Sequence, residues 1–281
     1  MLLQIHAQIQ SFLDEPHASD SLLGSVQRQT AISLDVVSAA LHKYEISELA
    51  ISYNGGKDCL VLLVLFLAEL GRRQSQQRNE RAIMSLGTNG KPEAVFGTEM
   101  KSIPAVYVRP ADPFPAVENF VMSSAKTYGL SLTKFTIGSS NMTLRDVFED
   151  YLAHQSDIRA ILVGTRRSDP HGENLSHFNN TDKGWPDFVR IHPVIDWSYR
   201  EIWAFIRHLR LEYCSLYNEG YTSLGGTSDT QPNPKLLKEQ FSWTKARTRS
   251  DGMVESEQKC QERYHPAYEL VDERNERLGR K

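Results

Sequence analysis

Short apolar runs and longer stretches with helical spacing of apolar residues follow one another along the chain. Apolar positions recur at helical intervals over residues 22–44, which predicts an amphipathic helix. Residues 48–53 read as a short buried strand and residues 59–70 as an apolar helix. The same criteria predict strands at 103–108, 130–136 and 158–164 and helices at 112–128 and 143–154. We expect Asp112 to cap the helix that follows it, with Pro113 at the first helical position.

The predicted strands are continuously apolar and do not alternate between apolar and polar positions. Such strands are typical of a parallel sheet that helices cover on both faces. Strands and helices also take turns along the chain, as they do when a helix joins each pair of parallel strands. The pattern therefore predicts an α/β fold, doubly wound and Rossmann-like, with a mostly parallel sheet and helices on both faces.

The pattern changes beyond Gly164. A long polar loop there precedes a strand at 189–195 and a helix at 199–209, and the charged tail at 268–280 is predicted to be helical. An earlier polar stretch, 71–92, carries four arginines and is predicted to be a solvated loop. We expect a single domain over residues 1–281, with a helical segment at 1–45, an α/β core at 46–210 and a C-terminal extension at 211–281.

Composition limits the partners of this chain. Of its 281 residues, 40% are hydrophobic and 24% are charged, which is an ordinary globular balance. The 32 basic and 35 acidic residues give a formal net charge of −3. Because no basic field is present, neither nucleic acid nor an anionic membrane is expected as a partner. A polyanion bound by this chain would have to be small and held by a few local groups.

The cysteines and the N-terminus indicate the compartment in which this chain is expected. The cysteines favour a reducing one. The three cysteines, Cys59, Cys214 and Cys260, are far apart and form no CxxC pair or disulfide framework. The longest apolar run, 59–68, is too short for a membrane span. No basic region precedes the apolar residues of the acidic N-terminus, which argues against a targeting segment. We expect a cytoplasmic monomer.

The first candidate site follows the strand at 48–53. The chain there reads Asn54-Gly55-Gly56-Lys57-Asp58 and turns directly into the apolar helix. Adjacent glycines allow close backbone approach, and a helix N-terminus favours an anion, so this turn is a candidate phosphate cradle. The pattern GxxxxGK[ST] is absent, which excludes a P-loop. A plain Gly-Gly turn between strand and helix is the structural alternative.

A second group of polar residues follows the strand at 158–164. The chain reads GTRRSDPHG from Gly164, TDKGWP from Thr181 and RIHP from Arg190. Arginines suit phosphates, an aspartate accepts from an N–H group, and Trp185 offers a stacking face. Together they would suit a flat heteroaromatic ring with an imide edge and a phosphate tail. All of these groups are predicted to lie beyond the carboxyl end of a strand.

Structural roles for the same residues stay open at this level. Trp185 alone could be a core residue, and Asp169 before its proline could initiate a turn. His192, which precedes Pro193, favours a structural interpretation over a catalytic one.

The ordered motifs supply a resemblance. The turn at Asn54 resembles the SGGxDS phosphate motif of the adenine nucleotide α-hydrolase-like superfamily, with Asn54 and Cys59 in place of its two serines. The stretch GTRRSDPHG…TDKGWPDFVRIHPVIDW, with YTSLGGTSDTQPNP downstream, resembles the eukaryotic (fungal-type) FAD synthases, or FMN adenylyltransferases, of the PAPS reductase-like superfamily. This resemblance extends over nearly the whole chain, and the ERLGR tail, with Arg277 and Arg280, is part of it.

The resemblance implies two sets of binding residues. It implies an ATP site made of Ser52, Asn54, Gly55, Gly56, Lys57, Asp58, Val106, Val108, Leu162, Gly164, Arg166 and Asp169. It implies a flavin site made of Asp169, Asp182, Lys183, Gly184, Trp185, Arg190, Arg277 and Arg280. Asn54, Asp58, Asp182, Arg277 and Arg280 are the candidate catalytic residues.

The implied reaction converts FMN and ATP into FAD and pyrophosphate with Mg²⁺. FAD is a product that the protein can retain, flavoproteins are possible recipients of it, and the direct Mg²⁺ ligands are left unassigned.

Three alternative functions were compared with FAD synthesis. A sulfonucleotide reductase would need a catalytic cysteine beside glycine and histidine, a setting that Cys260 lacks. An ATP pyrophosphatase that activates a carbonyl should keep the serines that Asn54 and Cys59 replace. A flavin carrier without activity would need neither Lys57 nor Asp58, and ATP binding would distinguish it.

Overall fold

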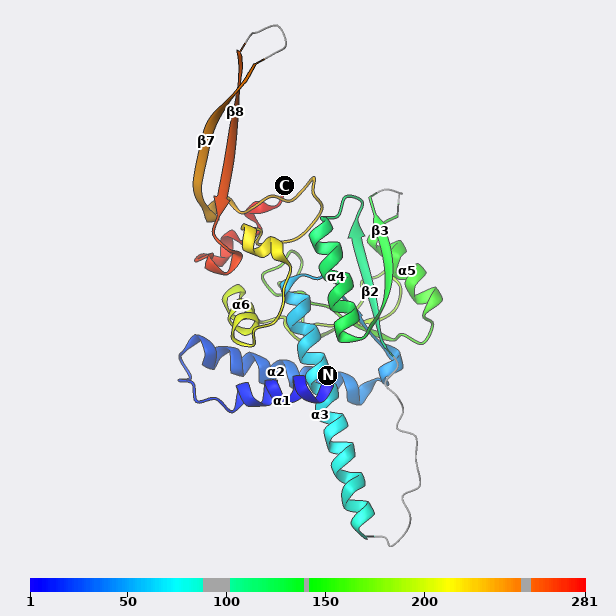
Figure 1. Cartoon of the computed structure of the whole chain (residues 1–281). Helices are drawn as coiled ribbons and strands as arrows, with labels where there is room; N and C mark the ends of the chain where they lie inside the picture. Colours follow the sequence, from blue (N-terminus) through cyan, green and yellow to red (C-terminus); the bar gives the residue numbers. More distant parts are fainter. Residues whose placement is uncertain (88–101, 139–141, 249–253) are drawn as a thin grey trace. The chain divides into compact units, whose positions relative to one another are not determined.

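The computed structural model describes residues 1–87, 102–138, 142–248 and 254–281. These residues divide into two compact units, Met1–Tyr213 and Cys214–Lys281. The first unit contains a six-stranded sheet and the α-helices, and the second contains a two-stranded hairpin and short 3₁₀ turns (Figure 1). The single domain over 1–281 stays a prediction.

The sheet of the first unit has the strand order β3-β2-β1-β4-β6-β5. Its strands are β1 (Leu49–Ser52), β2 (Ile103–Pro110), β3 (Leu130–Ile137), β4 (Ala160–Leu162), β5 (Phe178–Asn180) and β6 (Val189–Ile191). All neighbours pair in parallel except β5, which runs antiparallel to β6. The predicted α/β class with a mostly parallel sheet is confirmed. The strand order reverses between β1 and β4, and doubly wound sheets bind ligands outside the carboxyl ends at such a point.

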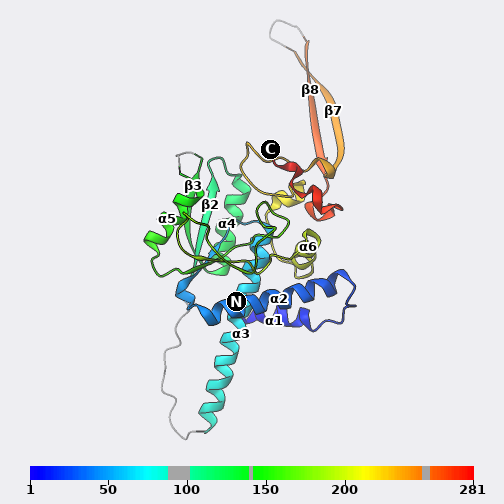
Figure 2. The same ribbon diagram turned by 180° about the vertical axis from the view of Figure 1, so that it is seen from behind.

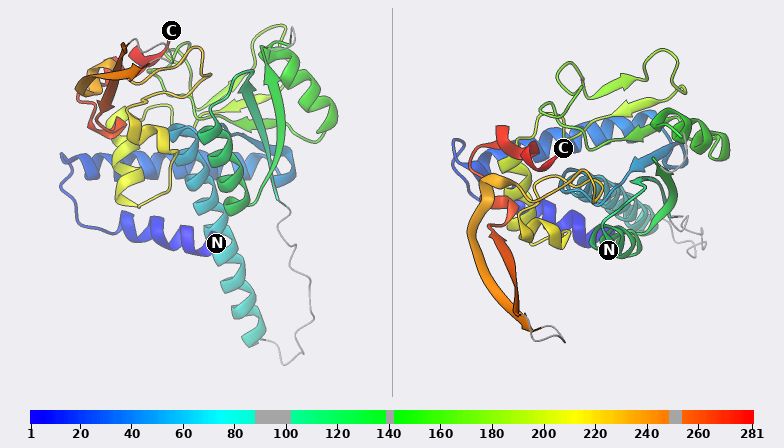
Figure 3. Two further views of the ribbon diagram at one scale, coloured as in Figure 1. Left: turned by 45° about the horizontal axis from the view of Figure 1, so that its top comes forward. Right: turned by 90° about the horizontal axis from the view of Figure 1, so that it is seen from above.

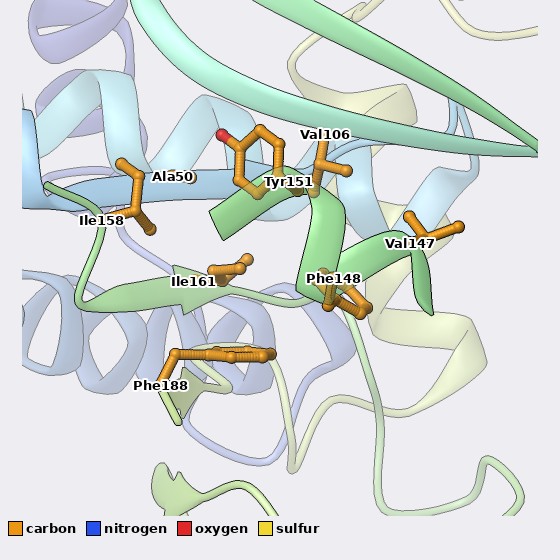
Figure 4. Packing of buried hydrophobic residues seen from close by; sticks show 8 residues of the cluster. All are labelled: Ala50, Val106, Val147, Phe148, Tyr151, Ile158, Ile161 and Phe188. Carbon is orange, nitrogen blue, oxygen red and sulfur yellow. The ribbon is translucent and has the colours of Figure 1, made fainter. Parts of the chain in front are cut away.

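Helices cover both faces of this sheet. They are α1 (Leu2–Leu13), α2 (Leu22–Lys43), α3 (Lys57–Gly87), α4 (Pro115–Tyr128), α5 (Leu144–His154) and α6 (Tyr199–His208). Phe148 and Tyr151 of α5 pack against Ala50 and Ile161 of the sheet (Figure 4). On the opposite face the Tyr53 hydroxyl lies 2.8 Å from Ser124 Oγ of α4.

The N-terminal helices are tied together by side chains. Helices α1 and α2 lie side by side (Figures 1 and 3), and Gln27 Nε2 donates to the Phe12 carbonyl at 2.7 Å. Among the described residues no helix has the length and apolar character that a membrane span requires.

The predicted loop at 71–92 is wrong over its described part, because α3 continues to Gly87. Arg and Gln are the most frequent residues of this stretch, and both are good helix formers. Arg72 Nε and Nη2 donate to the buried carboxylate of Glu69 at 2.7 and 2.6 Å, one turn earlier in the helix. Residues 88–92 lie outside the described residues.

Several boundaries also differ from the predicted ones. Helix α4 begins at Pro115 with Phe114 as its N-cap, so the start at Pro113 is wrong although a proline does occupy the first helical position. Strand β6 ends at Ile191 and not at 195. The three residues of β5 and the hairpin of the second unit were not predicted.

The second unit holds the C-terminal tail. Its hairpin consists of β7 (Leu237–Thr248) and β8 (Val254–Tyr264) (Figure 2). The tail forms 3₁₀ turns, with one at Glu273–Gly279, where an α-helix was predicted. The buried Asn233 Nδ2 donates to the Asn275 carbonyl at 2.7 Å and to Thr222 Oγ1 at 3.0 Å, which anchors the tail to the loop that precedes the hairpin.

Candidate functional site

The turn after β1 has the backbone of a phosphate cradle. Gly55 adopts φ +72°, and Asn54 Oδ1 accepts the Gly56 N–H at 2.9 Å just before α3 begins at Lys57. A Cβ on Gly55 would lie 2.8 Å from Val121 Cγ2 of α4. Glycine is therefore required here by both conformation and space. The turn presents the N-terminus of α3 at the carboxyl edge of the sheet, where an anion is stabilised.

A buried charge network lies under this turn. Asp58 Oδ2 is 3.0 Å from Lys57 Nζ, and Asp58 Oδ1 is 2.9 Å from Arg166 Nε. The two cationic side chains are only 2% and 1% exposed. Burial raises the pKa of Asp58, but Lys57 and Arg166 outweigh it and hold that pKa below its usual range. Lys57 Nζ also lies 5.2 Å from the centre of the Tyr199 ring, so its charge is fixed in place.

The loop after β4 closes onto this network. Asp169 Oδ2 accepts the Arg166 N–H at 2.8 Å, and the Gly172 N–H donates to the Asp169 carbonyl at 2.9 Å. Asp169 therefore shapes the turn, the structural role that the sequence had left open. Burial, and then the charge of Asp58, raise the pKa of Asp169.

Gly164 brings β4 and α3 together at the reversal of strand order. A Cβ there would lie 2.9 Å from both the N and the Sγ of Cys59. Burial raises the pKa of the Cys59 thiol to about 12, so this cysteine is not a nucleophile at neutral pH.

A pocket of about 370 Å³ opens beside the cradle. Its lining includes six of the residues predicted for nucleotide or flavin binding, namely Ser52, Asn54, Val108, Asp182, Trp185 and Arg190. Phe148 and Phe188 form one wall with ring centres 5.2 Å apart, and Trp185 lies 6.5 Å from Phe148. Trp185 is 37% exposed, so it is not a core residue. Arg190 Nη2 donates to the Asn180 carbonyl at 2.9 Å and lies 3.4 Å from Asp182 Oδ1.

The placement of this second group beyond a carboxyl end is wrong in part. Because β5 runs antiparallel to β6, the connection that carries Asp182 and Trp185 lies at the amino end of β6, and Arg190 lies within that strand. The pocket therefore runs along β6, from the amino end of this strand to the carboxyl edge where Asn54 lies.

Other predicted residues lie outside the lining of this pocket. Val106 and Leu162 are fully buried in their strands, and the Val106 carbonyl accepts the Tyr53 N–H at 2.9 Å. Lys183 and Gly184 are exposed in the β5–β6 connection. Their predicted contacts with ligands stay predictions.

The two tail arginines belong to the second unit and differ from each other. Arg280 Nη1 donates to the Leu224 carbonyl at 2.8 Å, and Nη2 donates to Asp229 Oδ2 at 2.8 Å. Arg277 is exposed, and its side chain makes no hydrogen bond or ion pair within the described part of the chain. Their predicted catalytic role stays a prediction.

Sequence reasoning missed pocket residues as well. Phe148 and Phe188 are not among the predicted site residues, and for His192 the sequence favours a structural role. The spacing of Arg190 and His192 is the signal that could have found the latter, because residues two apart on a strand share a face.

Comparison with known proteins defines the family. The sequence model of the phosphoadenosine phosphosulfate reductase domain matches residues 48–232. A probable FAD synthase of Schizosaccharomyces pombe is 37% identical over 254 residues, covering 90% of this chain and 87% of that protein. The flavin adenine dinucleotide synthase of Saccharomyces cerevisiae is 32% identical, covering 83% of this chain and 81% of that protein.

A solved structure agrees with these relatives. The FMN adenylyltransferase of Candida glabrata, in complex with FMN and an ATP analogue, has a TM-score of 0.78 at 29% identity and covers 100% of this chain and 96% of that one. The chain therefore belongs to the phosphoadenosine phosphosulfate reductase domain family and, within it, to the FAD synthases.

Proposed function

We propose that this protein transfers the adenylyl group of ATP to the phosphate of FMN, giving FAD and pyrophosphate. One observation carries the proposal beyond family membership. The pocket that contains Asp182, Trp185 and Arg190 ends at Ser52 and Asn54, where the phosphate cradle begins. A flavin ring in this pocket would point its phosphate tail at the cradle, where the phosphates of ATP would lie.

The reaction between the phosphate of FMN and the α-phosphate of ATP needs no acid–base catalysis by a side chain. A phosphate oxygen of FMN attacks the α-phosphorus of ATP in line, the new P–O bond forms, and the bond to the β-phosphate breaks with its electrons leaving on pyrophosphate. A phosphomonoester has its second pKa near 6 and is largely ionised at neutral pH, so no general base is needed. Catalysis rests on alignment of two anions and on neutralisation of charge.

The residues take the following roles in this proposal. Asn54, Gly55 and Gly56 bind the reacting phosphates. Lys57 and Asp58 belong to the buried charge network under that turn. Arg166 and Asp169 form the floor, and the strand ends at Val106, Val108, Leu162 and Gly164 hold adenine and ribose. Asp182 accepts the flavin N3–H, and Lys183, Gly184, Trp185 and Arg190 complete the flavin site.

Mg²⁺ fits this site as a partner of the substrate phosphates. Both carboxylate oxygens of Asp58 lie within 3.0 Å of a cationic side chain, so this aspartate suits contact with the ion through water. Asp169 Oδ2 accepts the Arg166 N–H, and Oδ1 lies 3.8 Å from Arg166 Nη2, so this aspartate also suits contact with the ion through water. Mg²⁺ held there would neutralise part of the charge that develops on pyrophosphate.

The two tail arginines have different roles in this proposal. Arg280 holds the tail through Asp229 and the Leu224 carbonyl, whereas Arg277 is available for a phosphate. We place the reaction in the cytoplasm, in a monomer that can retain FAD for transfer to flavoproteins.

A product assay tests the proposal. Protein, FMN, ATP and Mg²⁺ are incubated, and flavins are separated by chromatography while pyrophosphate is measured. We expect FAD and pyrophosphate in equal amounts, with turnover lost in Arg277→Ala and kept in Arg274→Ala, an equally charged tail variant whose side chain is 87% exposed. FMN binding without FAD formation would contradict the proposal and indicate a carrier.

A further inference from the structure

His192 is buried in the pocket with its ring unsatisfied. The side chain is 1% exposed and belongs to the pocket lining. Neither Nδ1 nor Nε2 has a hydrogen-bond partner among the described residues. Buried polar atoms are hydrogen-bonded in the large majority of cases, so two unsatisfied nitrogens on one ring need an explanation.

The backbone around this ring is well held. The His192 N–H donates to the His177 carbonyl at 2.9 Å, and Ser33 Oγ donates to the Pro193 carbonyl at 2.7 Å. Trp197 Nε1 donates in turn to Ser33 Oγ at 2.9 Å. The unsatisfied ring therefore stands on a rigid segment, which is how binding residues are pre-positioned.

The position of His192 along the pocket defines what it can reach. Arg190 lies in β6 and His192 is the first residue after that strand, and both line the pocket, so about 6–7 Å of extended chain separates them. Asp182 and Trp185 lie toward the amino end of β6, whereas His192 follows its carboxyl end, the edge at which Asn54 lies. His192 is thus placed between the ring end of the pocket and the phosphate cradle.

The protonation state of the His192 imidazole indicates which chemical group of a ligand it can bind. Burial, and then the charges of Arg190 and His177, lower the pKa of His192 to about 4. At neutral pH the imidazole is therefore uncharged, with one donor and one acceptor nitrogen. A phosphate offers only acceptors, but an alcohol hydroxyl both donates and accepts and so matches the imidazole.

We propose that His192 binds the hydroxyl groups of the ribityl chain, which joins the flavin ring to its phosphate. The inference rests on the proposed function, because it takes the pocket to be the flavin site. By holding this chain, His192 would aim the FMN phosphate at the cradle. It is a substrate-binding residue and takes no proton in the reaction.

Titration of three flavins by fluorescence tests this role without turnover. FMN and riboflavin carry the ribityl chain, and lumiflavin carries only the ring. We expect His192→Leu to weaken FMN and riboflavin binding about tenfold each, the worth of one hydrogen bond, and to leave lumiflavin and ATP binding unchanged. His192→Gln, whose amide also donates and accepts, should bind FMN within about threefold of the native protein.

Stability measurements separate this role from a structural one. Removing two unsatisfied buried nitrogens should leave the ligand-free His192→Leu protein at least as heat-stable as the native one. Native-like FMN affinity in His192→Leu, or an equal loss of lumiflavin binding, would overturn the proposal. If the native protein binds FMN but makes no FAD, the proposed reaction fails while these titrations still report on His192.

Discussion

The candidate phosphate cradle and the pocket proposed to hold the flavin lie at the same sheet but differ in the side chains that form them. Under the cradle, Lys57, Asp58 and Arg166 form a nearly buried charge network in which every distance is close to 3 Å. In the pocket the ion pair between Arg190 and Asp182 is 3.4 Å long, and the Asp182 side chain is 73% exposed. The rings of Phe148, Trp185 and Phe188 also line this pocket.

This difference follows from the ligands that each region is proposed to hold. Two anions must be brought together at the cradle, and fixed charges in a buried site act strongly because they need not reorganise. A flat ring is bound by apolar area and needs only a few polar groups for orientation. Substitutions in the cradle should therefore lower the free energy of unfolding, whereas substitutions in the pocket should mainly weaken ligand binding.

The largest effect is expected at the centre of the network. Asp58→Ala leaves two buried cations without their carboxylate, so the free energy of unfolding should fall by about 3–5 kcal/mol. Asp196→Ala is the matched control, because its ion pair with Arg167 is about half exposed and should be worth less than about 1 kcal/mol. Urea denaturation measures both. Equal losses would show that the cradle network is not special.

A smaller effect, confined to affinity, is expected in the pocket. Asp182→Ala should weaken FMN binding about 10- to 100-fold, as loss of a charged hydrogen bond does, and leave ATP binding intact. Because this side chain is 73% exposed, unfolding should be unchanged within about 0.5 kcal/mol. Asp187→Ala, an exposed residue of the same connection outside the pocket lining, is the control. Unaltered FMN affinity would remove Asp182 from the flavin site.

The turn glycines sharpen the contrast further. Gly55→Ala should destabilise the protein by about 2 kcal/mol for two reasons. The alanine would have to adopt a positive φ, and its Cβ would lie 2.8 Å from Val121 Cγ2. Gly184 also has a positive φ but no atom near its Cβ position, so Gly184→Ala should cost about 1 kcal/mol. Thermal unfolding of the two variants checks the order, and a reversal would contradict the tight packing of the cradle.

A separate effect concerns the response to acid. His192 has a folded-state pKa of about 4 against an ordinary 6.5, so the unfolded chain binds more protons between these values. Stability should therefore fall as pH falls through that window, by up to about 3 kcal/mol from this residue. Comparison of native and His192→Leu unfolding at pH 7 and pH 4.5 isolates the contribution. The same pH dependence in both proteins would rule it out.

Much of the α/β architecture could be predicted from the chain, for physical reasons. Strands such as β1 and β2 are continuous apolar runs, and the glycines at 55 and 56 mark the turn into α3, so fold and cradle follow from local pattern. Strand β5, with the sequence Phe-Asn-Asn, has no such pattern and exists because it pairs with β6. Missing it reversed the expected position of Asp182 and Trp185.

The ion pair between Arg166 and Asp58 could not be predicted from the sequence either. Arg166 is more than one hundred positions from Asp58 in the sequence, and only the meeting of β4 with the start of α3 brings them together. For His192 the difficulty was different. Its residue type favours several roles, and only burial without a partner distinguishes a binding group from a structural one.

The central claim is that ATP is attacked at its α-phosphorus by the phosphate of FMN. The direct test supplies FMN with ATP labelled in either the α- or the γ-phosphate and follows both labels after chromatography. We predict the α-label in FAD and the γ-label in pyrophosphate, in equal amounts. A γ-label in the flavin, or release of labelled AMP without FAD, would contradict the account.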